Sequence, residues 1–191
     1  MTRLFKLVAS TTILLSFAAT TMAQEEPATT PAPPPPPPHC ESNPGFADFD
    51  FWVGEWNVYS NDEARQFQGK NSITRHYSSC LLKEEWQGAQ GGGGFSINYY
   101  NPVKAEWRQV WVANGYSIDY AGGLNDDGAM VLTGHIYNYG RAAAAPFRGI
   151  WTPQTDGSVI QHFDLYDETS DTWNVWFEGL YVKKDPMTKG D

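Results

Sequence analysis

Turn signals recur at a short and regular spacing from residue 49 onward, and this regularity constrains the fold more than any other feature of the chain. They begin at positions 101, 114 and 127, so about 13 residues separate neighbouring turns. Asn-Gly and Asp-Gly pairs favour tight hairpins, because both central positions accept a positive φ. The signals are Asn101-Pro102, Asn114-Gly115, Asp127-Gly128, Asp156-Gly157 and residues 167–171, with further turns expected at Gly91–Gly94 and within Gly140–Pro146. This spacing predicts an antiparallel meander.

The segments between these turns alternate apolar and polar side chains with the period of a strand. Glycine and aromatic residues, which suit tightly turning pleated sheets, are abundant, with 18 Gly and 15% Phe, Trp and Tyr. Residues expected to share a face are Cys80/Leu82/Glu84/Trp86, Phe95/Ile97/Tyr99, Trp107/Gln109/Trp111 and Trp173/Val175/Phe177/Tyr181. A sheet of roughly nine or ten strands must hide its edges. We therefore predict an all-β domain, a closed antiparallel up-and-down β-barrel of about 8–10 strands, with a two-sheet β-sandwich as the alternative.

Composition divides the chain into four segments. Arg3 and Lys6 precede an apolar stretch, and small residues lead to an expected cut after Ala23, which is the pattern of a cleavable signal peptide. A run of prolines, Pro33–Pro38, then favours an extended spacer. We expect a periplasmic or secreted protein. The predicted order is a signal peptide (1–23), a proline-rich disordered tether (24–44), the β-barrel domain (45–185) and a flexible tail (186–191).

The charge balance excludes some classes of partner. The formal net charge is -9 and the isoelectric point is near 4.8, with no basic run downstream of the N-terminus. Nucleic acids and anionic membrane surfaces require clustered Lys and Arg, so neither is an expected partner. No segment after the signal peptide is long and apolar enough to span a bilayer, so we do not expect an integral membrane protein.

Cys40 and Cys80 are the two cysteines of the chain. Paired thiols persist as disulfides in the oxidising compartments that exported proteins reach. A redox or metal-binding pair would more often show the spacing Cys-x-x-Cys and neighbouring ligands, which these residues lack. We therefore predict a Cys40–Cys80 disulfide that ties the end of the tether to the barrel wall.

Several short motifs resemble a known family. Residues 49–59, the first expected strand, contain Gly54-Glu55-Trp56, which resembles the Gly-x-Trp of the first strand in lipocalin-like (calycin) barrels. Together the motifs resemble an exported bacterial calycin-like family over most of residues 49–182. The resemblance implies a barrel in which Trp56 plugs one end, and it implies no particular activity. The motifs are Phe51-Trp52-x-Gly54-x-Trp56, Cys80-x-Leu82-x-Glu84-x-Trp86, Trp107-x-Gln109-x-Trp111, Arg148-x-x-Trp151-Thr152-Pro153 and Asp156-Gly157 with Gln161.

The chain is also similar in outline to nitrobindin-type haem barrels, which share the first-strand Gly-x-Trp. In those barrels a histidine in a late strand ligates the iron. Here the final strand, residues 173–181, contains no histidine, and the nearest one is His162 in the preceding strand. The resemblance therefore implies the fold without the haem, and we expect no cofactor.

Polar residues on otherwise apolar faces mark the candidate ligand site. Glu84, Gln109, Arg148 and Gln161 each alternate with large apolar side chains. If these faces line a lumen, a few polar groups converge in an aromatic pocket, which is typical of small-molecule sites. In the alternative, Glu84 and Arg148 form a buried ion pair that only closes the barrel. The candidate ligand-binding residues are Trp56, Glu84, Trp86, Gln109, Trp111, His135, Arg148 and Gln161.

The sequence predicts neither a metal site nor a catalytic residue. A metal needs three or four converging ligands, and His135, His162 and Asp164 would supply three only if their strands met. Structural or solvated histidines are the simpler interpretation. Gly-x-Ser-x-Gly does not occur, and no Ser/His/Asp set can be identified by spacing.

Three functions are compatible with these features. We favour an exported barrel that binds a small apolar or aromatic molecule. The second is an isomerase- or hydrolase-type enzyme that uses Glu84 or His135 as acid or base beside Arg148, which rests on analogy of fold. The third is a structural envelope-interaction domain with a filled core. The sequence leaves the oligomeric state open.

Overall fold

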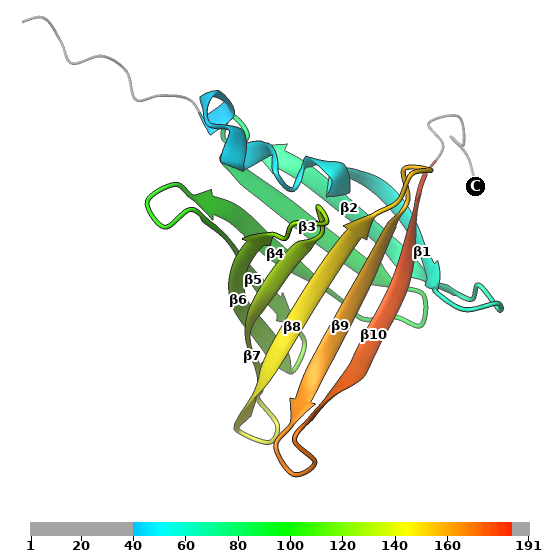
Figure 1. Ribbon diagram of the computed structural model, residues 1–191. Helices are drawn as coiled ribbons and strands as arrows, with labels where there is room; N and C mark the ends of the chain where they lie inside the picture. The colour runs from blue at the N-terminus through cyan, green and yellow to red at the C-terminus, as the bar shows by residue number, and fades with distance from the viewer. Residues whose placement is uncertain (1–39, 185–191) are drawn as a thin grey trace, which may run out of the picture. The chain divides into compact units, whose positions relative to one another are not determined.

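A computed structural model describes residues 40–184, and these form a closed antiparallel barrel of ten strands (Figure 1). Each strand pairs with its neighbours in the sequence, and β1 pairs with β10 to close the sheet. The up-and-down barrel is confirmed, and the two-sheet alternative is excluded. The strands are β1 (Gly54–Ser60), β2 (Phe67–His76), β3 (Leu81–Gly88), β4 (Gly93–Asn101), β5 (Glu106–Ala113), β6 (Tyr116–Leu124), β7 (Met130–Asn138), β8 (Ala143–Pro153), β9 (Val159–Asp167) and β10 (Thr172–Lys183).

The turn signals lie where the strands are joined. Asn114-Gly115 alone connects β5 to β6, and Gly115 has a φ of 94° that only glycine adopts readily. Two expected turns, residues 91–94 and 140–146, are shorter than the sequence indicated, because β4 begins at Gly93 and β8 begins at Ala143. A Cβ atom on Gly94 would lie 2.5 Å from the Trp111 ring. Glycine at this position therefore makes room for a neighbouring indole rather than forming a loop.

Short helices close one end of the barrel. The segment before β1 forms three 3-10 helices, η1 (Cys40–Ser42), η2 (Pro44–Ala47) and η3 (Asp50–Trp52), which lie across that end in Figure 1. The expected first strand, residues 49–59, therefore begins later, at Gly54. Phe49 and Trp52 are fully buried and stack at 4.8 Å between ring centroids. Phe49 also packs edge-on against Trp107 and Trp151, at 5.6 and 5.2 Å.

We call the helical segment of residues 40–52, together with the Trp56 side chain from β1, the plug. The Trp56 side chain is 1% exposed, and its indole N–H donates to the backbone carbonyl of Trp52 at 2.8 Å. Phe49 and Trp52 therefore share the plugging role that the family resemblance implied for Trp56 alone. A β-barrel of this size leaves open ends unless side chains or extra segments fill them. The plug fills the end at which the chain enters the barrel.

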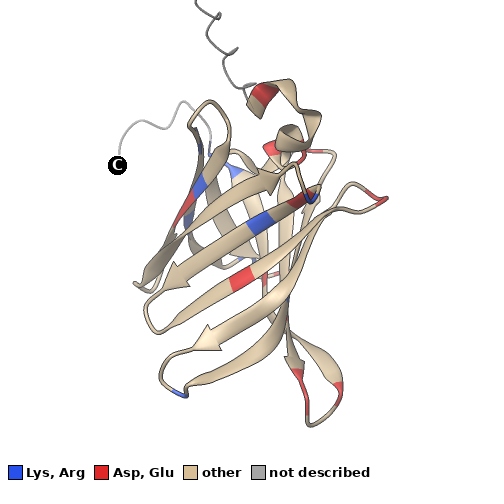
Figure 2. Ribbon diagram, turned by 90° about the vertical axis from the view of Figure 1, so that its left-hand side faces the viewer, with Lys and Arg blue, Asp and Glu red and all other residues tan. Residues whose placement is uncertain are grey.

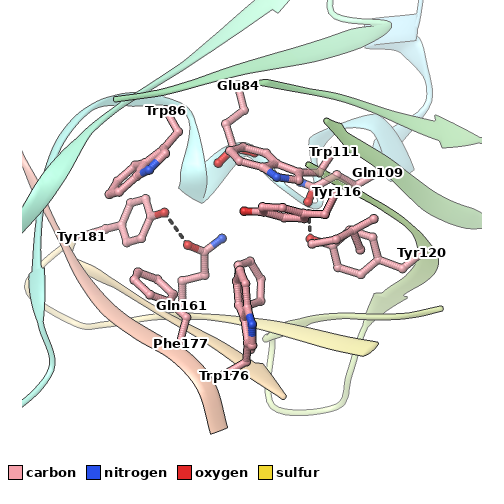
Figure 3. A pocket seen from close by; sticks show the side chains of 12 residues that line it. Glu84, Trp86, Gln109, Trp111, Tyr116, Tyr120, Gln161, Trp176, Phe177 and Tyr181 are labelled. Carbon is pink, nitrogen blue, oxygen red and sulfur yellow. Dashed lines mark hydrogen bonds between the residues drawn. The ribbon is translucent and has the colours of Figure 1, made fainter. Parts of the chain in front are cut away.

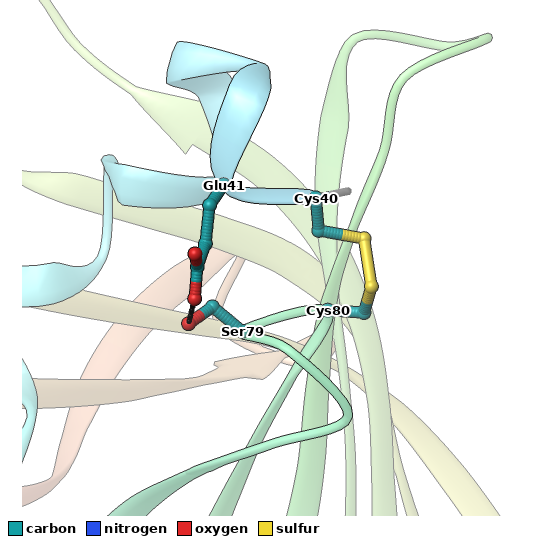
Figure 4. The surroundings of a disulfide bond; sticks show 4 residues. All are labelled: Cys40, Glu41, Ser79 and Cys80. Carbon is teal, nitrogen blue, oxygen red and sulfur yellow. Dashed lines mark hydrogen bonds between the residues drawn. A yellow bond between two sulfur atoms is a disulfide. The ribbon is translucent and has the colours of Figure 1, made fainter. Parts of the chain in front are cut away.

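The disulfide between Cys40 and Cys80 is present and ties η1 to the β2–β3 turn (Figure 4). A hydrogen bond from the Ser79 hydroxyl to the Glu41 carboxylate, 3.0 Å long, runs beside it. Disulfides of this kind persist in oxidising compartments, so the bond fits an extracellular or periplasmic protein. It anchors the helical plug to the barrel wall.

One β-bulge changes the alternation of the last strand. The pairing of β10 with β9 shifts between Val175 and Phe177, which leaves Trp176 as an extra residue. The expected shared face of residues 173, 175, 177 and 181 is therefore wrong. Val175 is 64% exposed on the outside, whereas Phe177 and Tyr181 face the lumen. The bulge also directs Trp176 into the lumen.

The predicted signal peptide, residues 24–39 of the tether and the predicted tail lie outside the described residues. Residues 40–44, which end the predicted tether, form the start of the plug. Within residues 40–184, no helix is long and apolar enough to cross a membrane.

Replacing both cysteines by serine tests how much the anchor of the plug contributes. The bond closes a loop of 40 residues, so the chain-entropy model predicts a loss of about 4 kcal/mol in the free energy of unfolding. Urea denaturation followed by tryptophan fluorescence measures the loss. The control is the wild type measured with the disulfide intact and again after reduction. A change below about 1 kcal/mol in the free energy of unfolding would contradict an anchoring role.

Candidate ligand-binding cavity

The lumen of the barrel holds a cavity of about 130 Å³ with mainly aromatic walls (Figure 3). It lies on the inner faces of β3, β5, β6, β9 and β10, so side chains from distant parts of the sequence meet there. Cavities of roughly this size take up one aromatic ring. The lining residues are Glu84, Trp86, Gln109, Trp111, Tyr116, Ile118, Tyr120, Gln161, Phe163, Trp176, Phe177 and Tyr181.

Five of the eight predicted site residues line this cavity, namely Glu84, Trp86, Gln109, Trp111 and Gln161. They come from β3, β5 and β9, whose alternate residues point inward. The strand period alone places them on shared faces with large apolar side chains. Closure of the barrel then brings the three strands round one space.

Trp56, His135 and Arg148 lie elsewhere. Trp56 belongs to the plug and is not among the residues that line the cavity. His135 is exposed on β7, where it lies beside Tyr137 on the outer face. Arg148 is adjacent in β8 to the fully buried Phe147, so its side chain points outward.

The alternative in which Glu84 and Arg148 form a buried ion pair is wrong. Both Nε and Nη2 of Arg148 donate to one carboxylate oxygen of Asp164, at 3.0 and 2.7 Å. Arg148 also lies over the Trp173 ring at 4.8 Å. The error has a simple cause, because adjacent residues of a strand face opposite sides of the sheet and the sequence did not say which face was inside.

His162 belongs to the same outer network. Its two ring nitrogens lie 2.6 Å from a Glu178 oxygen and 2.8 Å from an Asp164 oxygen. Burial lowers the pKa of His162, but these two carboxylates outweigh it and leave the pKa raised. His135 takes no part in the network, and residues 40–184 contain no cluster of His, Cys, Asp and Glu that could hold a metal. The network ties β8, β9 and β10 together on the outer face.

Buried polar side chains inside the lumen form a hydrogen-bonded polar belt. Its first arm starts at the Tyr120 hydroxyl, which donates to the Gln109 amide oxygen. The Gln109 nitrogen donates to Asn98, and the Asn98 nitrogen donates to the Ser96 hydroxyl at 2.8 Å. The Ser96 hydroxyl donates to the Glu84 carboxyl at 2.7 Å. This arm crosses four neighbouring strands, from β6 to β3.

The second arm of the polar belt reaches Glu84 from the other side. The Tyr181 hydroxyl donates to the Gln161 amide oxygen and accepts from the Asn71 nitrogen at 3.1 Å. The same Asn71 nitrogen donates to the other Glu84 oxygen at 2.7 Å. Both arms therefore end on one carboxyl group. The Gln161 nitrogen points into the open cavity (Figure 3).

Glu84 is the charged residue of this cavity, and it has no ion-pair partner among the described residues. Its side chain is 3% exposed. Burial raises the pKa of the Glu84 carboxyl to about 7, although hydrogen bonds from Asn71 and Ser96 favour the ionised form. Burial also raises the pKa of Tyr116, Tyr120 and Tyr181, so these hydroxyls stay protonated at neutral pH.

A second, wider space of about 500 Å³ adjoins the cavity on the side away from the plug. Tyr116 and Trp176 line both spaces, and their rings meet edge to face with centroids 5.9 Å apart. We call this outer space the vestibule. It leads to the turns at the open end, and its other lining residues are Ile136, Asn138, Arg141, Ala143, Ala144, Ala145, Leu165, Tyr166, Asp167, Glu168 and Asn174.

Seven residues that line the cavity were not among the predicted site residues. Ile118 and Tyr120 alternate in β6 as an inner face should, so their signal was present in the sequence. Phe163 alternates with Gln161 in β9, so its signal was also present in the sequence. Trp176 had no signal, because a strict period of two places it outside and only the bulge turns it inward.

Comparison with protein-family models and with curated proteins finds no match to this chain. The strand pairing establishes the barrel fold. Membership of a calycin family stays a prediction.

Glu84→Gln tests the burial of the carboxyl group. In the wild type the unfolded carboxyl ionises near its ordinary pKa of 4.5, whereas the folded one holds its proton until about pH 7. Stability is therefore lost as the pH rises between these values, by about 3 kcal/mol in total. We expect the variant to lack this pH-dependent loss of stability. Its free energy of unfolding relative to that of the wild type should therefore rise from about pH 5 to about pH 8, as measured by urea unfolding.

Glu85→Gln is the matched control, because Glu85 is the exposed neighbour of Glu84 and carries only a surface ion pair with Lys83. It should change stability by less than about 1 kcal/mol at either pH. A pH profile of Glu84→Gln that parallels the wild type would refute the raised pKa.

Proposed function

We propose that this protein is an exported barrel that binds a small apolar or aromatic molecule in its lumen. The observation that carries the proposal is the cavity itself, which has aromatic walls, a few converging polar groups and one closed end. This composition is typical of small-molecule sites. The disulfide supports a location outside the cytoplasm, as the predicted signal peptide does.

The alternatives receive less support. A structural domain with a filled core would leave no space in the lumen, whereas the cavity is about 130 Å³. The enzyme hypothesis invoked Glu84, His135 and Arg148, and two of these lie on the outer face. Glu84 remains, with a pKa of about 7 that suits a general acid or base. Proton transfer by Glu84 is thus the second candidate function.

Tryptophan fluorescence tests the binding proposal, because Trp86, Trp111 and Trp176 line the cavity. We expect single-ring aromatic compounds to quench the oxidised full-length protein saturably, and Trp176→Ala to weaken binding about tenfold through loss of one aromatic contact. Trp176 is 42% exposed, so the variant should fold.

Trp173→Ala is the matched control. Trp173 lies on the same strand and is 40% exposed, but it faces outward beneath Arg148. Its replacement should leave affinity unchanged. Equal losses in both variants, or no saturable quenching by any compound of the series, would rule out binding in the lumen.

A further inference from the structure

We propose that the ligand is a small organic cation, an amine or quaternary ammonium compound, bound with its charged group beside Glu84 within the aromatic walls of the cavity. This inference rests on the proposed function and names the chemical class of the ligand. Three independent features of the barrel support it: the rings around Glu84, the lack of a countercharge, and the acidic mouth.

The first feature is the arrangement of rings round one carboxyl group. In Figure 3, Trp86, Trp111, Tyr116 and Trp176 surround the space into which Glu84 points. Aromatic faces attract cations through their ring quadrupoles, and such cages are the usual receptors of quaternary ammonium groups. A neutral apolar ligand would use the rings equally well, but it would leave the charge of an ionised Glu84 carboxylate unmatched.

The second feature is the missing countercharge. A buried ionised carboxylate requires a partner, because transfer of an unpaired charge out of water is strongly unfavourable. Among the described residues the Glu84 carboxyl accepts hydrogen bonds only from Asn71 and Ser96, and both donors are neutral. Every Arg or Lys in a described ion pair is bound to a carboxylate other than Glu84. A cationic ligand supplies the charge that the protein leaves out.

The third feature is the charge of the entrance. Figure 2 shows that charged residues are sparse along the strands and that acidic residues lie on several turns. At the open end, the β7–β8 and β9–β10 turns with the adjoining end of β9 carry three acidic residues and one basic residue. An acidic mouth attracts cations and raises their local concentration. The acidic residues are Asp167, Glu168 and Asp171, and the basic residue is Arg141.

The two spaces limit the size of the ligand. The inner cavity, at about 130 Å³, has room for a trimethylammonium group or a single ring. The vestibule of about 500 Å³ would take a longer substituent beyond the Tyr116–Trp176 contact. We therefore expect a compact cationic group with one short tail.

Binding of a cation must be coupled to ionisation of Glu84. The titratable groups that face it are Tyr116 and Tyr120 on β6 and Tyr181 on β10, and all three remain protonated near neutrality. Among the groups that face the cavity, Glu84 alone therefore changes charge in this range. Affinity should be highest above about pH 7 and should fall towards tenfold per pH unit below it.

The test compares choline with 3,3-dimethylbutanol, in which a neutral carbon replaces the ammonium nitrogen at the same size. Titration calorimetry of the oxidised full-length protein at about pH 8 and about pH 5.5 gives both affinities. We expect choline to bind at least tenfold more tightly than the alcohol at the higher pH. The preference should collapse at the lower pH and in Glu84→Gln, and it should persist in the control Glu85→Gln.

The outcomes separate this inference from the proposed function. If the alcohol binds as tightly as choline, or if Glu84→Gln keeps the preference, the cation proposal fails while an apolar ligand stands. If neither probe binds and single-ring aromatics do not quench, both proposals fail. Glu84→Gln is expected to be more stable than the wild type at about pH 8, so misfolding would not mimic the expected loss.

Discussion

The pairing of β1 with β10 is the interaction on which the rest of this structure depends. It runs from Trp56 opposite Lys183 to Ser60 opposite Gly179, and it removes the last free edges of the sheet. Closure converts alternating strands into an inside and an outside, so that one residue in two contributes to a common lumen. The cavity would not exist in an open sheet, because its walls come from strands that lie far apart in the chain, from β3 to β10.

The interior is a compromise between packing and polarity. The end near the plug is filled by stacked and edge-on aromatic rings, and it supplies the apolar burial that stabilises a domain of this size. The polar belt has an unfavourable effect on stability, because it places a carboxyl group and several amides out of contact with bulk water. Such a network is worse than an apolar core unless its members are satisfied. The polar belt converges on Glu84 beside an unfilled cavity, and the proposed binding role rests on this arrangement.

The outer face and the lumen divide the charged groups between them. Arg148, His162, Asp164 and Glu178 pair with one another on the outside of β8–β10, where partial exposure moderates each ion pair. Glu84 lies in the lumen without an ion-pair partner among the described residues. This division supports the proposal of a cationic ligand. The Arg and Lys residues in described ion pairs are bound to other carboxylates. The Glu84 carboxyl group accepts hydrogen bonds only from neutral donors.

The sequence by itself determined the strand order and most turns, and it determined which residues of β3, β5 and β9 share a face, because hairpin signals and a period of two are local properties. It therefore grouped Glu84, Gln109 and Gln161 with the large apolar side chains of their strands. The disulfide followed from the presence of two cysteines in a chain expected to be exported. Only the tertiary structure decided that Arg148 and His135 point outward, that the segment before Gly54 folds into a plug, and that a bulge turns Trp176 inward. These depend on which face closure buries and on one unpaired residue in β10, and no local pattern contains either.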